Sequence, residues 1–128
     1  MFIAKDGYVY FMNNRLTLYP TGLKHPSMRS CLLDGEYITK GKLNTKLDMY
    51  MCFDCYCVNG KDVREKDLPT RLDNIKMALK DWDTSKPIIK LKEFFYGSTN
   101  IMVDTQKCLD RSITLPYHTD GLIYTPLY

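Results

Sequence analysis

Turn signals between apolar runs constrain this chain more than any other feature of its sequence. Lys5-Asp6-Gly7 separates the runs Met1–Ala4 and Tyr8–Met12, and Asn59-Gly60 ends the long run Leu47–Val58. Asp-Gly between such runs is a strong hairpin signal, since both residues tolerate a positive φ. Ten tyrosines and five phenylalanines against one tryptophan also favour strands. The sequence therefore predicts a largely antiparallel sheet.

The rest of the chain predicts further strands and one or two helices. Strands are expected over Leu16–Tyr19, Ser30–Thr39, Ile88–Phe95 and Leu122–Thr125. A loop is expected over Pro20–Pro26 and a polar turn over Lys40–Lys46. A helix capped by Asp67 is expected because apolar residues recur at helical spacing, at Leu68, Leu72, Ile75, Leu79 and Trp82. With a second short helix over Met102–Leu109, the expected fold class is α+β.

Length and composition exclude several classes of protein. The 128 residues allow one compact domain or a piece of a larger one. With 45% hydrophobic and 26% charged residues, the chain is neither collagen-like nor disordered. No apolar run approaches the roughly 20 residues that span a bilayer, so no membrane partner is expected. The net charge of +3 permits an anionic partner without requiring one.

Five cysteines, at positions 31, 52, 55, 57 and 108, favour a reducing compartment because an odd number cannot form a closed disulfide framework. Cys52, Cys55 and Cys57 form a C-x-x-C-x-C string, which leaves a metal site open, although zinc needs about four converging ligands. The same stretch fits a strand, with Phe53, Cys55 and Cys57 on one face and Cys52 on the other. Buried thiols on a strand are the favoured interpretation.

Three short segments carry residue types that suit nucleotide chemistry. In Leu32–Tyr37, Asp34 and Glu36 point to the same strand face, where a carboxylate can reach a ribose hydroxyl or a hydrated metal. Gly35 between them would let a ligand approach the backbone closely. Taken alone, Asp34-Gly35-Glu36 fits an acidic hairpin end better.

The second and third segments add an aromatic ring, a cation and another carboxylate. Phe53 could stack on a base, and Arg71 follows in Leu68-Pro69-x-Arg71. Asp120 precedes Gly121 and an expected apolar strand, so its carboxylate could bind a divalent cation together with Glu36. The plainer alternatives are a core phenylalanine, a solvated helix arginine and a turn aspartate.

In order and spacing, these segments resemble motifs of the covalent nucleotidyltransferases, the mRNA capping guanylyltransferases and the ATP-dependent polynucleotide ligases. Leu33-Asp34-Gly35-Glu36 looks like motif III, and Phe53-Asp54 with the downstream Leu-Pro-x-Arg looks like motif IIIa. Asp120–Pro126 looks like motif IV, in the aspartate form that is closer to capping enzymes than to ligases. The residues in and around these three segments are similar to those of capping enzymes of large cytoplasmic DNA viruses. That resemblance implies a location in the host cytoplasm or the virion.

Two parts of the family pattern have no match in this chain. The nucleophilic lysine of that family lies in a K-x-D-G motif, whereas Lys5-Asp6-Gly7 lacks the intervening residue and is expected to be a hairpin turn. The lysine-rich motif V is not found either. Residues 1–128 are therefore expected to be the central segment of a nucleotidyltransferase domain, without the oligonucleotide-binding-fold domain, and to be inactive alone.

The resemblance implies a function and a set of site residues. The parent would be an mRNA guanylyltransferase that moves GMP from GTP, through a lysyl-GMP intermediate and with Mg²⁺ or Mn²⁺, to the 5′-diphosphate end of RNA. Glu36 would contact the ribose or metal-bound waters, Asp34 the nucleotide, Phe53 the guanine, and Asp120 with Glu36 the metal. Lys92, or else Lys90, would donate to the guanine O6, and Arg71 would complete the nucleotide site. Partners would be GTP, the RNA 5′ end and the rest of the enzyme.

Two alternatives remain open at this point: a ligase segment, which would use ATP, and a noncatalytic nucleotide-binding module. Self-association is also expected, because unpaired strand edges at Met1–Ala4 or Leu122–Leu127 could pair between copies.

Overall fold

A hairpin begins the sheet, as the Asp6-Gly7 turn signal predicts. The computed structural model describes residues 1–128, and in it β1 (Phe2–Ile3) and β2 (Tyr8–Met12) pair antiparallel. Gly7 adopts a φ of +89° in the turn between them, a conformation that glycine reaches without strain. Lys5 lies in the same turn and is exposed, which confirms the hairpin interpretation of Lys5-Asp6-Gly7.

The third strand is longer and later than the sequence predicts. β3 covers Leu18–Lys24 and therefore includes Pro20 and Gly22, which were expected to lie in a loop. Pro20 is tolerated because β3 pairs only with β2 and forms an edge of the sheet, where a missing backbone N–H matters little.

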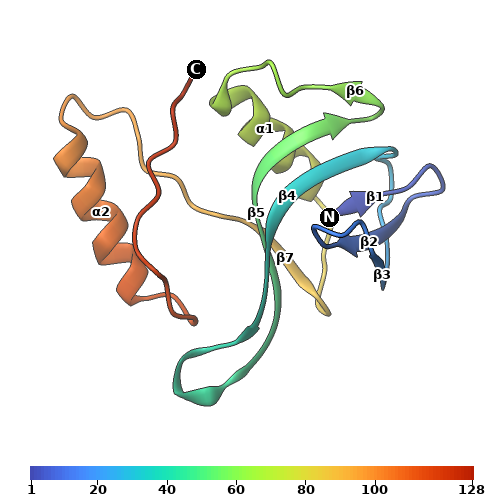
Figure 1. The fold of residues 1–128 in the computed structure, drawn as a ribbon, viewed down its shortest axis with the longest axis horizontal. Coiled ribbons are helices and arrows are strands. Elements are labelled where there is room, and N and C mark those ends of the chain that lie inside the picture. The colour runs from blue at the N-terminus through green and yellow to red at the C-terminus, as the bar shows by residue number, and fades with distance from the viewer.

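A long two-stranded ribbon dominates the molecule. β4 (Cys31–Lys40) and β5 (Lys46–Val58) pair antiparallel, joined by the short 3₁₀ turn η1 (Lys42–Asn44), and both predicted strands are confirmed. The ribbon curves strongly, and its tip projects away from the rest of the sheet (Figure 1). After the Asn59-Gly60 turn, β6 (Lys61–Asp62) pairs back onto β5.

The sheet order is β3-β2-β1-β4-β5-β6, with β7 (Ile88–Leu91) parallel to β5. Because β1 pairs with both β2 and β4, Met1–Ala4 lies inside the sheet, and the expected free edge there is wrong. Leu122–Leu127 forms no strand, so the other expected edge is also wrong. β7 ends before Phe95, earlier than predicted, since its parallel pairing stops opposite Cys52.

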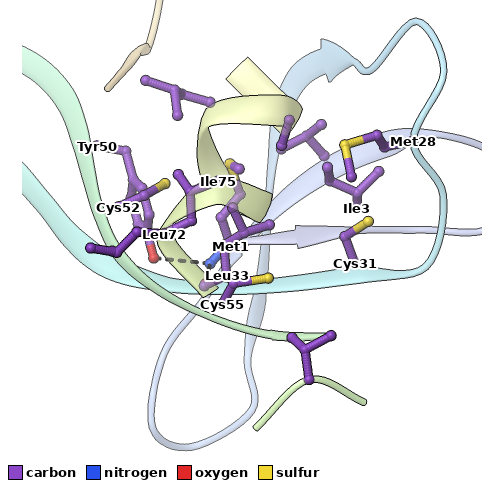
Figure 2. Close-up of a cluster of buried hydrophobic side chains, with 14 of the residues drawn as sticks. Met1, Ile3, Met28, Cys31, Leu33, Tyr50, Cys52, Cys55, Leu72 and Ile75 are labelled. Carbon is purple, nitrogen blue, oxygen red and sulfur yellow. Dashed lines mark hydrogen bonds between the residues drawn. The ribbon is translucent and has the colours of Figure 1, made fainter. Parts of the chain in front are cut away.

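Helix α1 (Leu68–Leu79) packs against β5 and β7 and closes the main core. The Asp67 side chain accepts a hydrogen bond from the Thr70 N–H, so the predicted N-cap is confirmed, while Trp82 lies beyond the helix end. Figure 2 shows the core under this helix, with Leu72 and Ile75 facing side chains of the sheet. Its buried members include Ile3, Leu33, Tyr50, Cys52, Cys55, Leu72 and Ile75.

Helix α2 (Ile101–Ile113) extends further at both ends than the predicted Met102–Leu109. The Asn100 side chain caps it by accepting from the Met102 N–H. It stands apart from the sheet, and the chain that follows runs back between α2 and the ribbon (Figure 1). The mixed architecture confirms the α+β class with a mostly antiparallel sheet. Neither helix is long and apolar enough to cross a membrane.

The ribbon breaks strict strand alternation, which changes where the cysteines point. Asp34 pairs with Asp54 and Gly35 with Cys52, so Phe53 is an extra residue on β5. Such a bulge reverses the alternation of faces. Consequently Cys52 and Cys55 are both buried in the same core, and their predicted placement on opposite faces is wrong. All five cysteines are free thiols, and Cys57 is half-buried.

Candidate nucleotide site on the β4–β5 ribbon

The bulge at Phe53 sets the geometry of the candidate site. Lys92, just after β7, donates its backbone N–H to the Cys52 carbonyl at 2.7 Å, which carries the chain past the bulge. The Lys92 ammonium lies 5.9 Å from the centre of the Phe53 ring, at the outer limit of a cation–π contact. Two residues that the sequence predicts for base recognition therefore lie together, although 39 positions separate them along the chain, from 53 to 92.

Lys90 lies on the neighbouring strand beside Met51. The two are partners in the parallel β5–β7 ladder, and Met51 is in turn the partner of Glu36 on β4. Paired residues point to the same face of a sheet. Lys90 on β7 and Glu36 on β4 are both exposed, so a cation and a carboxylate lie on the same face of the sheet, on either side of Met51.

The Asp34 carboxylate is occupied by contacts within the protein. Its Oδ2 accepts a 2.6 Å hydrogen bond from the Tyr56 hydroxyl, and its Oδ1 accepts from the Gly35 N–H. The bond to Asp34 and burial together raise the pKa of Tyr56 to about 12. The observed role of Asp34 is thus to fix Tyr56 across the ribbon; its predicted contact with a nucleotide stays a prediction.

Arg71 is likewise engaged with the protein. Its Nε donates to Asp54 Oδ1 at 2.7 Å, and the two side chains are only 17% and 19% exposed. The bond to Asp54 raises the pKa of Arg71. This ion pair ties α1 to β5 directly beside Phe53, which makes Arg71 a support of the bulge in the observed geometry.

Glu36 faces the chain segment that leads to Asp120. A cavity of about 480 Å³ is lined on one side by β4 from Glu36 onward and on the other by Tyr117 and His118. Burial, and then the nearby Glu36 charge, raise the pKa of Tyr117. Asp120 itself is exposed and lies in an irregular segment, so the strand expected to follow it is wrong. The physical reason is that residues 122–125 find no partner strand in the sheet.

The carboxylates that could hold a cation are few and spread out. No group of three or more His, Cys, Asp or Glu side chains converges anywhere in the structure. Mg²⁺ commonly binds through one or two carboxylates together with substrate phosphates and waters. Glu36 and Asp120 are both exposed, and each carboxylate is the type of donor that such a site uses.

The structure gives a packing reason for glycine at position 35, whereas the sequence suggested close approach of a ligand to the backbone. A Cβ atom there would lie 2.4 Å from the Tyr50 ring and 2.5 Å from the Met51 carbonyl oxygen. The space beside the glycine is therefore filled by Tyr50, which is buried and stacks on Phe11 with 4.6 Å between ring centres. Sequence reasoning missed Tyr50, Tyr56 and Tyr117; the tyrosine-rich composition was the only signal for them.

Comparison with known proteins identifies the family. The model of the mRNA capping enzyme catalytic domain matches residues 1–128. The mRNA-capping enzyme subunit alpha of Saccharomyces cerevisiae is 30% identical over 112 residues, which is 75% of this chain and 23% of that protein. The subunit alpha of Kluyveromyces lactis is 28% identical over 110 residues, 75% of this chain and 22% of that protein. The chain thus spans about a quarter of the length of these relatives. Because the family model matches every residue of the chain, the chain belongs to the mRNA capping enzyme catalytic-domain family.

Proposed function

We propose that the β4–β5 ribbon binds the guanosine of GTP within an mRNA guanylyltransferase. The observation that carries the proposal is the contact between the Lys92 ammonium and the Phe53 ring. A base stacked on Phe53 would have a cation beside its edge, and guanine carries a carbonyl oxygen there where adenine carries an amino group. Lys92 would then favour guanine over adenine.

Glu36 would hold the ribose, two strand positions from Asp34 and on the row that leads away from Phe53. The exposed carboxylate is free of side-chain partners, unlike that of Asp34. Lys90, exposed on the adjoining strand, would add positive charge near the nucleotide. Asp120 would reach a divalent cation, Mg²⁺ or Mn²⁺, from the segment whose His118 lines the same cavity as Glu36.

In the complete enzyme, a lysine amine would attack the α-phosphate of GTP. An N–P bond forms, the bond to the β-phosphate oxygen breaks, and pyrophosphate leaves; GMP then passes to the 5′-diphosphate end of RNA. The amine must lose its proton before the attack, which nearby cations and burial favour. This chain contains no K-x-D-G motif, and Lys5 lies in an exposed turn. We therefore propose that residues 1–128 alone form no GMP adduct and need the rest of a capping enzyme as partner.

Two further features belong to the proposal. The residues of the three motif-like segments are similar to those in capping enzymes of large cytoplasmic DNA viruses. We therefore propose a viral protein that acts in the host cytoplasm, and the flanking coding sequence tests this.

Self-association would use β3, whose outer edge is unpaired and carries the exposed Leu18 and Tyr19. Light scattering at increasing concentration tests this, and a strict monomer contradicts it.

Nucleotide titrations of the isolated chain test the guanosine site. Base stacking is worth roughly 1–3 kcal/mol, so we expect a Kd for GTP near 1 mM, which corresponds to about 4 kcal/mol with the added polar contacts. Phe53→Ala should weaken GTP binding about tenfold. Lys92→Met should remove the preference for GTP over ATP. Tyr128→Ala, which removes a fully exposed ring, is the matched control and should leave binding unchanged.

Three outcomes would overturn the proposal. The first is equal binding of ATP and GTP by the unmodified chain, which would favour a ligase-type site. The second is GTP binding that survives Phe53→Ala. The third comes from incubation with α-labelled GTP and a divalent metal: a labelled band that survives boiling and disappears in Lys5→Ala would make the chain itself an active enzyme.

A further inference from the structure

The tip of the β4–β5 ribbon collects positive charge without a compensating acid. Residues 39–47 contain Lys40, Lys42 and Lys46 and no Asp or Glu. None of the three forms an ion pair. Three lysines with no acidic residue between them therefore lie at one projecting end of the molecule (Figure 1).

The arrangement of these lysines is unfavourable for the protein by itself. Lys40 and Lys46 are direct partners across the β4–β5 ladder. Like charges directly opposite each other destabilise a sheet. Neither ammonium has a hydrogen bond in the structure, whereas Lys42 Nζ donates to the Ile113 carbonyl at 2.9 Å and is held at the end of α2. An anion between Lys40 and Lys46 would remove the repulsion.

A cavity with planar surfaces adjoins the lysine pair. It is the cavity of about 480 Å³ that Glu36, Lys40, Tyr117 and His118 line, and its volume lies in the range of small-molecule sites. The rings that face it are those of Tyr117, which is buried, and His118, which is exposed, whereas the Tyr37 ring packs against Phe11 with 5.0 Å between ring centres. Proteins that bind single-stranded nucleic acid combine cations along the backbone with aromatic rings on which bases stack. An acidic peptide would use the lysines but would have no need of the rings.

The position of the Lys40–Lys46 pair, beyond the proposed guanosine site, suits binding of the acceptor RNA. Lys40 lies about 13 Å beyond Glu36 along β4, on the side away from Phe53. We propose that Lys40 and Lys46 bind phosphodiester groups of the acceptor RNA, while the cavity beside His118 receives one of its bases. This inference rests on the proposed function, because it places the RNA relative to the guanosine site.

Binding of a fluorescein-labelled single-stranded RNA, with a 5′-diphosphate, tests the site in the absence of GTP. The double variant Lys40→Ala/Lys46→Ala should weaken binding about tenfold and lower the slope of log K against log salt by about 1.4, or 0.7 per phosphate contact. The matched control is Lys61→Ala/Lys66→Ala, two exposed lysines away from the tip, which should change neither. Both double variants should keep the GTP affinity of the unmodified chain.

Competitors distinguish the possible ligands. If the proposal holds, inorganic tripolyphosphate and polyglutamate of matched charge displace the RNA only at much higher concentration than unlabelled RNA. Equal displacement by tripolyphosphate would make the tip a free-phosphate site, and equal displacement by polyglutamate would make it an acidic-protein site; either overturns the proposal. So does equal loss in the two double variants. A chain that binds RNA through the pair but fails to bind GTP would refute the proposed function alone.

Discussion

Replacing Gly35 with alanine tests the packing that supports the ribbon. The new methyl carbon would lie 2.4 Å from Tyr50 Cε1 and 2.5 Å from the Met51 carbonyl oxygen, whereas carbon atoms in contact are normally about 3.5–4.0 Å apart. The neighbours must therefore move by about 1 Å. Tyr50 has little freedom to move, because it stacks on Phe11. Its hydroxyl also accepts a hydrogen bond from the Met1 amine at 2.9 Å (Figure 2).

The expected loss of stability is large for a single methyl group. Overpacking typically costs 1–3 kcal/mol, and a backbone neighbour places Gly35→Ala near the upper end, at about 3 kcal/mol. Gly22→Ala is the matched control: Gly22 has a φ of +79° and nothing within 4 Å of the added carbon. That variant should lose only the backbone term of about 1 kcal/mol. Urea unfolding followed by circular dichroism measures both.

A double-mutant cycle identifies the cause. In a Tyr50→Ala background the ring no longer opposes the methyl group, so Gly35→Ala should cost at least about 1 kcal/mol less than in the unmodified chain. Two results would refute the reasoning: a Gly35→Ala protein within about 0.5 kcal/mol of the unmodified chain, or strict additivity with Tyr50→Ala.

Three further predictions concern charges and thiols. Burial raises the pKa of Cys52 to about 12 and that of Cys55 to about 11, from an ordinary value of 9.0. Above about pH 9 the folded state therefore keeps protons that the unfolded chain loses, so the urea midpoint should fall as the pH rises. A midpoint that does not change with pH would contradict the burial argument. Asp54→Asn should destabilise by about 2 kcal/mol in urea unfolding, because Arg71 would keep a mostly buried charge with a neutral partner, and a loss below about 0.5 kcal/mol would show the pair to be dispensable. Asp67→Ala should cost about 1 kcal/mol through loss of the α1 cap, whereas Asp67→Asn should restore most of it in thermal melts.

Local features of the sequence predicted those parts of the fold that depend on neighbours along the chain. The Asp6-Gly7 hairpin, the Asp67 cap and the two ribbon strands follow from turn chemistry and periodicity, and the structure confirms each of them. The family followed from ordered short motifs, and the match to the capping enzyme family over residues 1–128 confirms it.

Tertiary contacts decided the features that depend on residues far apart in the sequence. Pro20 is part of a strand only because β3 ends the sheet, and Leu122–Thr125 is not a strand because no partner is present for it. Strict alternation put Cys52 and Cys55 on opposite faces, whereas the bulge at Phe53 buries both.

Within the candidate site the same division holds. The sequence by itself determined the residue types: a carboxylate at Glu36, a ring at Phe53 and cations at Lys90 and Lys92. Only the tertiary structure decided which of them meet, because pairing register and bulges depend on the whole sheet. It brings the Lys92 ammonium over Phe53, whereas it commits Asp34 to Tyr56 and Arg71 to Asp54, since a half-buried charge is stabilised by the nearest partner that packing supplies.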